Sequence, residues 1–599
     1  MSTENFMVIT KEDMKKREWE ELDFIIISGD AYVDHPSFGV AIISRMLENE
    51  GFKVGIIAQP DWRDAENFKR LGRPRLGFLV TAGNLDSMVN NYTVNKNRRR
   101  EDAYSPGGQP GRRPDRATIV YCNRVREAYK GVPLIIGGLE ASLRRFAYYD
   151  YWDDRVRRSV IFDSRADLLV YGMGEKQILE LAHCLDSGME VKYIRHIQGT
   201  CYIADDLDEI YNYRQIPSYE EVKEDKETFA RAFQAEYEEQ DSLRGKVVVQ
   251  KHGNRYLVQN PPAEPLNRRE LDRVYSLPYQ REYHPLYEDK GGVPAIREVK
   301  FSITSSRGCF GGCSFCSLAF HQGRIVTSRS KESIVREAKK LTQREDFKGY
   351  IHDVGGPTAN FRNPACTRQK RKGSCKNREC LYPEPCANLN VDHSEYLDIL
   401  RTLRNLEGVK KVFIRSGLRY DYIEADGNDE FMRELCRHHV SGLLKVAPEH
   451  ASSRVLDLMN KPDIEVFDKF RNKFYRINDE LGKEQYLIPY LISGHPGSTL
   501  EDAVELAEYL RDIDHHPEQV QDFYPTPGTL STAMYYSGYD PRTLEEVYVP
   551  RDREKKKMQR ALLQYNYPGN YHLVYRALKQ VGREDLIGEN DKALIPPKK

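Results

Sequence analysis

The sequence predicts an α/β protein built from three successive parts. Short apolar runs that end in glycine alternate with amphipathic stretches in the N-terminal third, which indicates a Rossmann-like parallel sheet. After residue 298 strand-like and helix-like stretches alternate six times, which is typical of a partial (βα)6 barrel. The last stretch carries only helical patterns. We therefore expect domains at 1–205, 298–530 and 531–599, with a connector at 206–297.

Charge and hydropathy narrow the function classes. Lysine plus arginine equals aspartate plus glutamate, 91 each among 599 residues, so the net charge favours neither nucleic acid nor an anionic membrane as partner. No apolar run is long enough to span a bilayer, and the N-terminus does not resemble a secretory leader. We expect a cytoplasmic protein without a membrane partner.

In the N-terminal domain a helical pattern over Gly39–Asn49 follows the first predicted strand. The predicted strands are Asp23–Ser28, Phe52–Ile57, Leu76–Thr81, Leu134–Ile136 and Leu168–Val170. The stretch 90–115 is polar and rich in glycine and proline, so we expect a solvated loop with its arginines exposed. The aromatic and charged stretch 140–154 predicts either a cavity wall or a buried interdomain contact.

The connector combines a charged helix, Ser218–Asp241, with a hairpin pattern around His252–Asn254. Prolines then interrupt regular structure before the barrel begins near Glu298.

Cys309, Cys313 and Cys316 follow the first predicted barrel strand at the spacing C-x3-C-x2-C. Thiolates select zinc or iron–sulfur clusters, and a structural zinc site needs four ligands. Three cysteines leave one iron of a [4Fe–4S] cluster without a protein ligand. The alternatives are a zinc site completed by His321, or three structural thiols.

This loop, with Phe315 directly before its last cysteine, resembles the cluster loop of the radical S-adenosylmethionine (SAM) superfamily. Stretches such as SGDAYVDHPSFG, GGLEASLRR, YGMGE and KVAPEH make the whole chain similar to the YgiQ-type family. The resemblance implies a [4Fe–4S] cluster, SAM and an electron donor such as flavodoxin or ferredoxin. It also implies reductive cleavage of SAM to a 5′-deoxyadenosyl radical, and it names no substrate.

The same resemblance gives roles to residues after later strands. Gly355 and Gly356 correspond to a Gly-Gly-Glu segment that grips the amino group of SAM, with Pro357 in place of the acid. Arg415, Ser416 and Arg419 are expected at the SAM carboxylate, since a guanidinium fork suits carboxylate geometry. Phe315 and Glu449 are expected near the cofactor as well.

The N-terminal strand order resembles cobalamin-binding domains. Asp34 and Gly39 match the ends of the signature Asp-x-His-x-x-Gly, but Pro36 occupies the ligand position and the only nearby histidine is His35. We therefore favour a Rossmann-like domain without a corrinoid over cobalamin-assisted methyl or methylthio transfer.

A second cysteine group lies in an insertion at residues 366–386. Cys366, Cys375, Cys380 and Cys386 are spaced C-x8-C-x4-C-x5-C, and four thiolates complete a zinc site or hold a second iron–sulfur cluster. A non-catalytic zinc protein that binds nucleic acid, with zinc in both groups, is the alternative from another function class.

The tail predicts helices at Pro541–Glu546, Glu554–Gln564 and Tyr571–Val581. Because radical methylthiotransferases carry a β-rich RNA-binding module at this place, a helical tail argues against transfer RNA as substrate.

Overall fold

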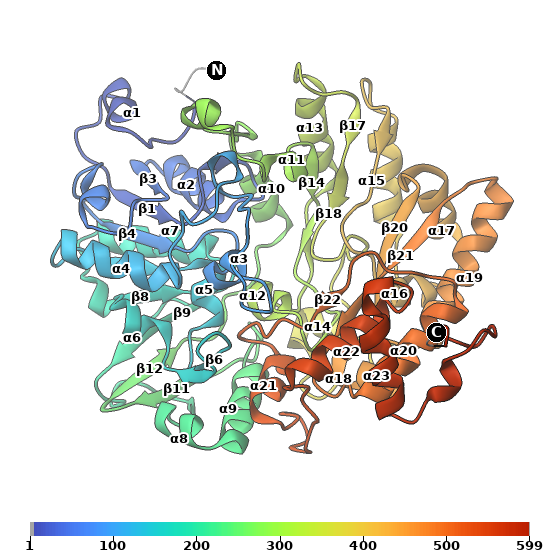
Figure 1. The fold of residues 1–599 in the computed structure, drawn as a ribbon. Helices are drawn as coiled ribbons and strands as arrows, with labels where there is room; N and C mark the ends of the chain where they lie inside the picture. Colours follow the sequence, from blue (N-terminus) through green and yellow to red (C-terminus); the bar gives the residue numbers. More distant parts are fainter. Residues whose placement is uncertain (1–4, 598–599) are drawn as a thin grey trace.

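The computed structural model describes residues 5–597. The N-terminal half, blue to teal in Figure 1, and the barrel with its C-terminal extension, green to red, lie side by side. This arrangement places the predicted Rossmann-like domain against the predicted barrel.

Among the described residues, nine strands form the N-terminal sheet in the order β10-β11-β12-β9-β8-β5-β4-β1-β3. Their bounds are β1 Phe24–Ser28, β3 Val54–Ala58, β4 Gly77–Thr81, β5 Leu134–Ile136, β8 Leu168–Val170, β9 Thr200–Ala204, β10 Tyr213–Ile216, β11 Val247–His252 and β12 Arg255–Gln259. The five adjacent strands β8, β5, β4, β1 and β3 pair in parallel, so their carboxyl ends share one edge of the sheet.

Helices cover both faces of this sheet. Helices α2 (Gly39–Asn49) and α7 (Glu175–Asp186) pack on one face, and α4 (Ala117–Ala128) and α6 (Val160–Ser164) pack on the other. Both faces are therefore buried, which is why every residue of β1 is buried and apolar or small.

The connector hairpin completes this sheet. Strand β12 pairs antiparallel with both β9 and β11, so the sheet extends to Gln259, beyond the predicted boundary at residue 205. The predicted helix Ser218–Asp241 is divided into α8 (Tyr219–Glu224) and α9 (Lys226–Glu238). Asp225 is extended between them, and its carboxylate accepts a hydrogen bond of 2.6 Å from the Thr228 amide.

The barrel strands are β14 (Ser302–Thr304), β17 and β18 (Tyr350–Ile351 and Asp353–Gly355), β19 (Lys411–Val412), β20 (Leu443–Glu449), β21 (Tyr486–Ser493) and β22 (Gln521–Asp522). The pairs β14–β18, β17–β19, β20–β21 and β21–β22 are all parallel. The outer helices are α13 (Lys331–Thr342), α15 (Ser394–Arg404), α17 (Glu430–Glu434), α19 (Ile464–Leu481) and α20 (Leu500–Asp512). The predicted fold class is confirmed.

The C-terminal extension is helical, with α21 (Leu530–Ser537), α22 (Arg553–Leu563) and α23 (Tyr571–Gln580). The predicted helix Pro541–Glu546 is wrong. Asp540 instead organises turns, because its backbone carbonyl accepts from the Leu544 amide at 2.7 Å and its carboxylate binds the Arg542 side chain. Leu544 has a φ of 63°, which is incompatible with a right-handed helix.

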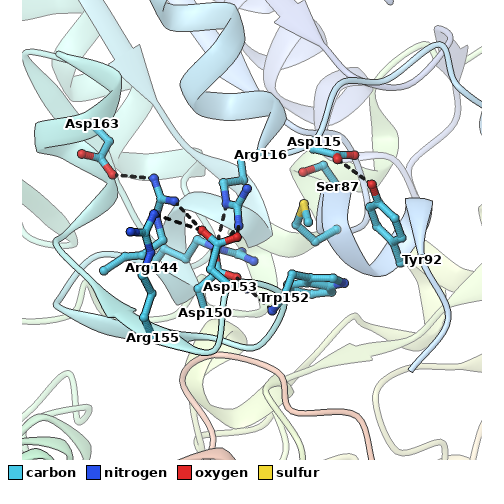
Figure 2. Close-up of polar contacts among 12 residues, drawn as sticks. Ser87, Tyr92, Asp115, Arg116, Arg144, Asp150, Trp152, Asp153, Arg155 and Asp163 are labelled. Carbon is cyan, nitrogen blue, oxygen red and sulfur yellow. Dashed lines mark hydrogen bonds and ion pairs between the residues drawn. The ribbon is translucent and has the colours of Figure 1, made fainter. Parts of the chain in front are cut away.

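The aromatic stretch is an interdomain contact. Strands β6 (Tyr148–Asp150) and β7 (Arg155–Arg157) form a small hairpin, and Tyr149 stacks on Tyr536 with ring centroids 4.7 Å apart. Figure 2 shows how Arg116 holds this hairpin through Asp150 and Asp153, each at 2.8 Å. The buried-contact alternative is therefore the one that the structure supports.

Arg113 departs from the prediction that the arginines of the 90–115 loop are solvated. Its side chain is fully buried and donates to Asp30 at 2.6 Å. A buried guanidinium needs such a carboxylate, so this arginine fixes the loop to the end of β1.

Candidate functional site

A cavity of about 720 Å³ separates the carboxyl edge of the N-terminal sheet from the barrel. The wall from the sheet is mainly apolar residues and glycine: Pro36, Val40, Ile43, Leu79, Ile136, Gly137, Gly138, Val170, Gly172 and Gly174. The wall from the barrel is more polar: Ser302, Thr304, Ser306, Arg307, Asp353, Gly355, Gly356, Arg415 and Ser416. A concave space with convergent polar groups is the usual form of a ligand site.

Asp353 organises the barrel wall. One carboxylate oxygen accepts from the backbone amides of Arg415 and Ser416 at 2.8 and 3.1 Å, and the Ser416 hydroxyl donates to the other oxygen. The loop after β19 is thereby fixed beside β18. Of the predicted cofactor residues, Gly355, Gly356, Arg415 and Ser416 all line the cavity.

The Gly355–Gly356 pair permits this close approach. A Cβ on Gly355 would lie 2.0 Å from the Ser416 hydroxyl oxygen, and one on Gly356 would lie 2.6 Å from that of Ser306. Side chains at these positions would push the two loops apart.

The cysteine loop follows β15 (Ser306–Arg307), and its three thiols are free and half-buried. Gly308 has a φ of 80°, and a Cβ there would lie 2.3 Å from the Ile325 carbonyl oxygen. The loop is held by Asn460, which donates to the Gly312 carbonyl at 2.9 Å, and by a 2.7 Å hydrogen bond between Ser314 and Ser531. The loop is thus positioned by contacts from several elements.

Arg419 contacts the cysteine loop. Its guanidinium donates to the Gly311 carbonyl at 3.1 Å and to Cys313 Sγ at 3.4 Å, while it forms a bidentate pair with Asp421. These contacts occupy the group that the sequence interpretation directed toward the SAM carboxylate. Arg415, which is exposed to the cavity, has the more accessible guanidinium.

Burial favours the protonated thiols of Cys309 and Cys316. Burial raises the pKa of Cys309, and burial together with the Cys313 thiol raises the pKa of Cys316 to about 12. Within residues 5–597, no three histidine, cysteine, aspartate or glutamate side chains form a ready-made metal site. A metal would therefore have to displace protons and turn the thiols toward one another.

Phe315 and Glu449 are outside the cavity lining. Phe315 packs edge-on against His495, with centroids 6.2 Å apart. Glu449 is buried with a φ of 75°, and burial raises the pKa of its carboxyl group against the opposing charges of Lys461 and Arg419. The structure does not bring these two residues together with the glycine pair.

The cysteines of the second group lie between β18 and α15, and all four are free and half-buried. Their insertion packs against the cysteine loop, since Cys309 and Cys380 contact the same buried cluster, and it also contacts the segment between α9 and β11 through Asp241.

Sequence reasoning missed the ion pair that joins the two walls. Glu175 at the start of α7 binds Arg307, and the two side chains are only 3% and 8% exposed. One Glu175 oxygen and one Arg307 nitrogen have no partner among the described residues. The available signal was an acid directly after Gly172–Gly174 and a cation directly before the cysteine loop.

Family models match most of the chain. "Radical SAM N-terminal" matches residues 6–302, "Radical SAM superfamily" matches 303–510, and "Domain of unknown function (DUF3362)" matches 518–599. A UPF0313 protein of Clostridium perfringens is 63% identical over 599 residues, covering 100% of this chain and 90% of the relative. The chain belongs to the UPF0313 family, within the radical SAM superfamily.

Another UPF0313 relative, from Clostridium botulinum strain Kyoto, is 60% identical over 596 residues and is covered to 92%. Among solved structures, the cobalamin-dependent SAM radical enzyme OxsB with aqua-cobalamin bound matches with a TM-score of 0.52 and 10% identity. The match covers 97% of this chain and 75% of OxsB. At that identity the likeness establishes the fold alone.

Membership in this superfamily makes the UPF0313 chain an enzyme with SAM as its partner. The alternative of a non-catalytic zinc protein is therefore not retained. None of the described helices has the length and hydrophobicity needed to cross a bilayer.

Proposed function

We propose that Cys309, Cys313 and Cys316 hold a [4Fe–4S] cluster and that the chain cleaves SAM reductively beside it. The observation that carries this proposal is a loop with three free thiols that directly follows Ser306 and Arg307, two residues of the polar wall of the cavity. When bound and reduced, such a cluster supplies one electron that splits SAM into methionine and a 5′-deoxyadenosyl radical. The three cysteines fit, since they leave one iron open to a small molecule.

The barrel wall orients the cofactor. Gly355 and Gly356 line the cavity; the Gly355 carbonyl accepts from the Ser305 amide at 2.6 Å, so the Gly356 carbonyl is the acceptor for the SAM amino group, without the acid that Pro357 replaces. Arg415 provides a fork that fits the SAM carboxylate, and Asp353 fixes the backbone that carries it. Arg419 and Asn460 hold the cysteine loop in register with this wall.

The apolar wall of the N-terminal sheet holds the substrate and excludes water from the radical. A target C–H bond in this cavity would be held within contact of the reactive carbon. The reducing cytoplasm suits an oxygen-sensitive cluster, with a flavodoxin or ferredoxin as electron donor.

Anaerobic reconstitution with iron and sulfide, followed by dithionite and SAM, tests the proposal. We expect 5′-deoxyadenosine from the wild type and none from Cys313→Ala. Cys184→Ala, a half-buried cysteine in α7 outside both groups, is the matched control and should retain the activity. Full activity of Cys313→Ala would refute the proposed ligand.

A corrinoid-assisted methyl transfer is the second candidate, favoured by the loops that follow the parallel strands and line the cavity. His35 is only 1% exposed and is not among the residues that line the cavity, so its imidazole is not presented there as an axial ligand. A corrinoid there would have to bind without an imidazole from this segment. Cobalamin that co-purifies in stoichiometric amount would support this candidate, and its absence after growth with cobalamin would oppose it.

A further inference from the structure

We propose that Cys366, Cys375, Cys380 and Cys386 hold a second iron–sulfur cluster that passes electrons from an acidic donor protein to the SAM cluster. The relay role rests on the proposed function, whereas the presence of the second cluster does not.

The two cysteine groups flank one apolar cluster. Phe310, from the cysteine loop, stacks on Phe361 with ring centroids 3.8 Å apart. Cys309 and Cys380 both pack against the buried cluster that contains these rings. The insertion therefore lies directly against the loop of the SAM cluster, with no other domain between them.

A polar link reinforces this contact. Arg324, just after the cysteine loop, pairs with Glu379 and donates to the Cys375 carbonyl at 3.3 Å. The Glu379 carboxylate lies against Gly312, where an added Cβ would be 2.3 Å from its oxygen. Gly312 lies between Cys309 and Cys313, so the side chain of Glu379 packs directly against the backbone of the first cysteine group.

Contacts within the insertion bring its cysteines together along the chain. Arg324 donates to the Cys375 carbonyl at 3.3 Å and pairs with Glu379, the residue directly before Cys380. The Cys386 amide donates to the Cys380 carbonyl at 3.0 Å. All four sulfurs are free, and four thiolates complete the ligand set of a cluster that needs no open iron.

The insertion is anchored independently of any metal. The Ser374 amide donates to Asp241 at 2.6 Å, and the buried Gln369 side chain accepts from the Ala365 amide at 2.7 Å and donates to the Arg324 carbonyl at 3.1 Å. These contacts fix the insertion beside the cysteine loop. Zinc is redox-inactive, so only an iron–sulfur cluster could use this placement to transfer an electron.

The surface of the insertion indicates the donor. Residues 366–386 contain two acidic residues, Glu379 and Glu384, and six exposed basic ones. The basic residues are Arg368, Lys370, Arg371, Lys372, Lys376 and Arg378. A basic rim over a redox centre complements an acidic one-electron carrier and accelerates its association at low salt.

The electron balance is simple. The donor would lose one electron, which would reach the cluster held by Cys309, Cys313 and Cys316 by way of the second cluster; the same electron would be taken up by SAM as its sulfonium–carbon bond breaks, giving methionine and the 5′-deoxyadenosyl radical. No other oxidant or reductant is needed.

Iron and sulfide content after anaerobic reconstitution tests the second cluster. The wild type should contain about eight irons per chain, and a Cys309→Ala/Cys313→Ala/Cys316→Ala variant should retain about four. After reduction this variant should show the electron paramagnetic resonance spectrum of an iron–sulfur cluster. This variant changes no residue of the insertion, so loss of the remaining iron could not be attributed to substitutions in the second cysteine group. Zinc in place of the remaining iron, or loss of all iron, would overturn the proposal.

The relay is tested with two reductants. Lys370→Glu/Arg371→Glu/Lys372→Glu should form 5′-deoxyadenosine normally with dithionite but roughly tenfold more slowly with reduced bacterial flavodoxin at low salt. Equal flavodoxin-driven rates in this variant and the wild type would overturn the relay. A wild type that retains eight irons but never cleaves SAM would refute the proposed function and leave the second cluster standing.

Discussion

The two walls of the cavity differ in what they offer a ligand. The N-terminal wall consists mainly of apolar side chains and glycines at strand ends, whereas the barrel wall carries Asp353, Arg307, Arg415 and two glycines packed tightly against serines. The barrel wall is also cross-linked by hydrogen bonds from Asp353 to two amides. The difference indicates that one wall fixes a polar cofactor and the other accommodates an apolar surface.

The largest effect is expected from Asp353→Ala. The amides of Arg415 and Ser416 would lose their shared acceptor, the loop would shift, and 5′-deoxyadenosine formation should fall about 100-fold. Asp398→Ala removes an exposed carboxylate on α15 and is the matched control. Retention of wild-type rates by Asp353→Ala would show that this wall does not position the cofactor.

A smaller effect is expected from Gly355→Ala. Its Cβ would meet the Ser416 hydroxyl oxygen at 2.0 Å, so equilibrium dialysis should show SAM affinity lowered about tenfold. At Gly417, two residues after Arg415, an added Cβ meets no atom within 4 Å. Gly417→Ala should therefore bind SAM as the wild type does, and equal losses in both variants would contradict the close-contact argument.

The link between the walls is tested through stability. Glu175→Ala leaves the buried Arg307 without its carboxylate and should lower the free energy of unfolding in urea by about 3–5 kcal/mol. Lys176→Ala, next to it, removes an exposed pair with Glu270 and should cost less than about 1 kcal/mol. Similar losses in both variants would mean that Glu175 and Arg307 contribute no more than a surface pair.

A pH-dependent effect is expected at the end of β1. Burial raises the pKa of Asp30 to about 6, although Arg113 opposes the shift. Because folding raises this pKa, the stabilising contribution is complete below about pH 4 and is lost as pH rises through 6. The stability of the wild type relative to Asp30→Asn should thus fall between pH 4 and 7, by up to about 3 kcal/mol. A constant difference across this range would contradict the shift.

Local patterns predicted most elements, and long-range contacts account for the differences. The helix Gly39–Asn49 and the strands Leu134–Ile136 and Leu168–Val170 have the predicted bounds, because apolar periodicity and flanking glycines define them locally. The pairing of β12 with β9 depends on residues more than 50 positions apart, so the connector hairpin was assigned to no sheet.

The candidate site shows the same limit. Glycine and arginine positions at strand ends predicted the barrel wall, since parallel strands bring their carboxyl ends together. The partners of Arg419, Arg113 and Glu175 follow from tertiary packing, and no spacing in the sequence indicates them.

The account rests most directly on the products formed from SAM by the wild-type chain after anaerobic reconstitution and reduction with dithionite. It predicts methionine and 5′-deoxyadenosine in equal amounts, and neither product from the variant in which Cys309, Cys313 and Cys316 are alanine. Intact SAM after incubation with wild-type chain that carries its full complement of iron, or equal product from the variant, would contradict it.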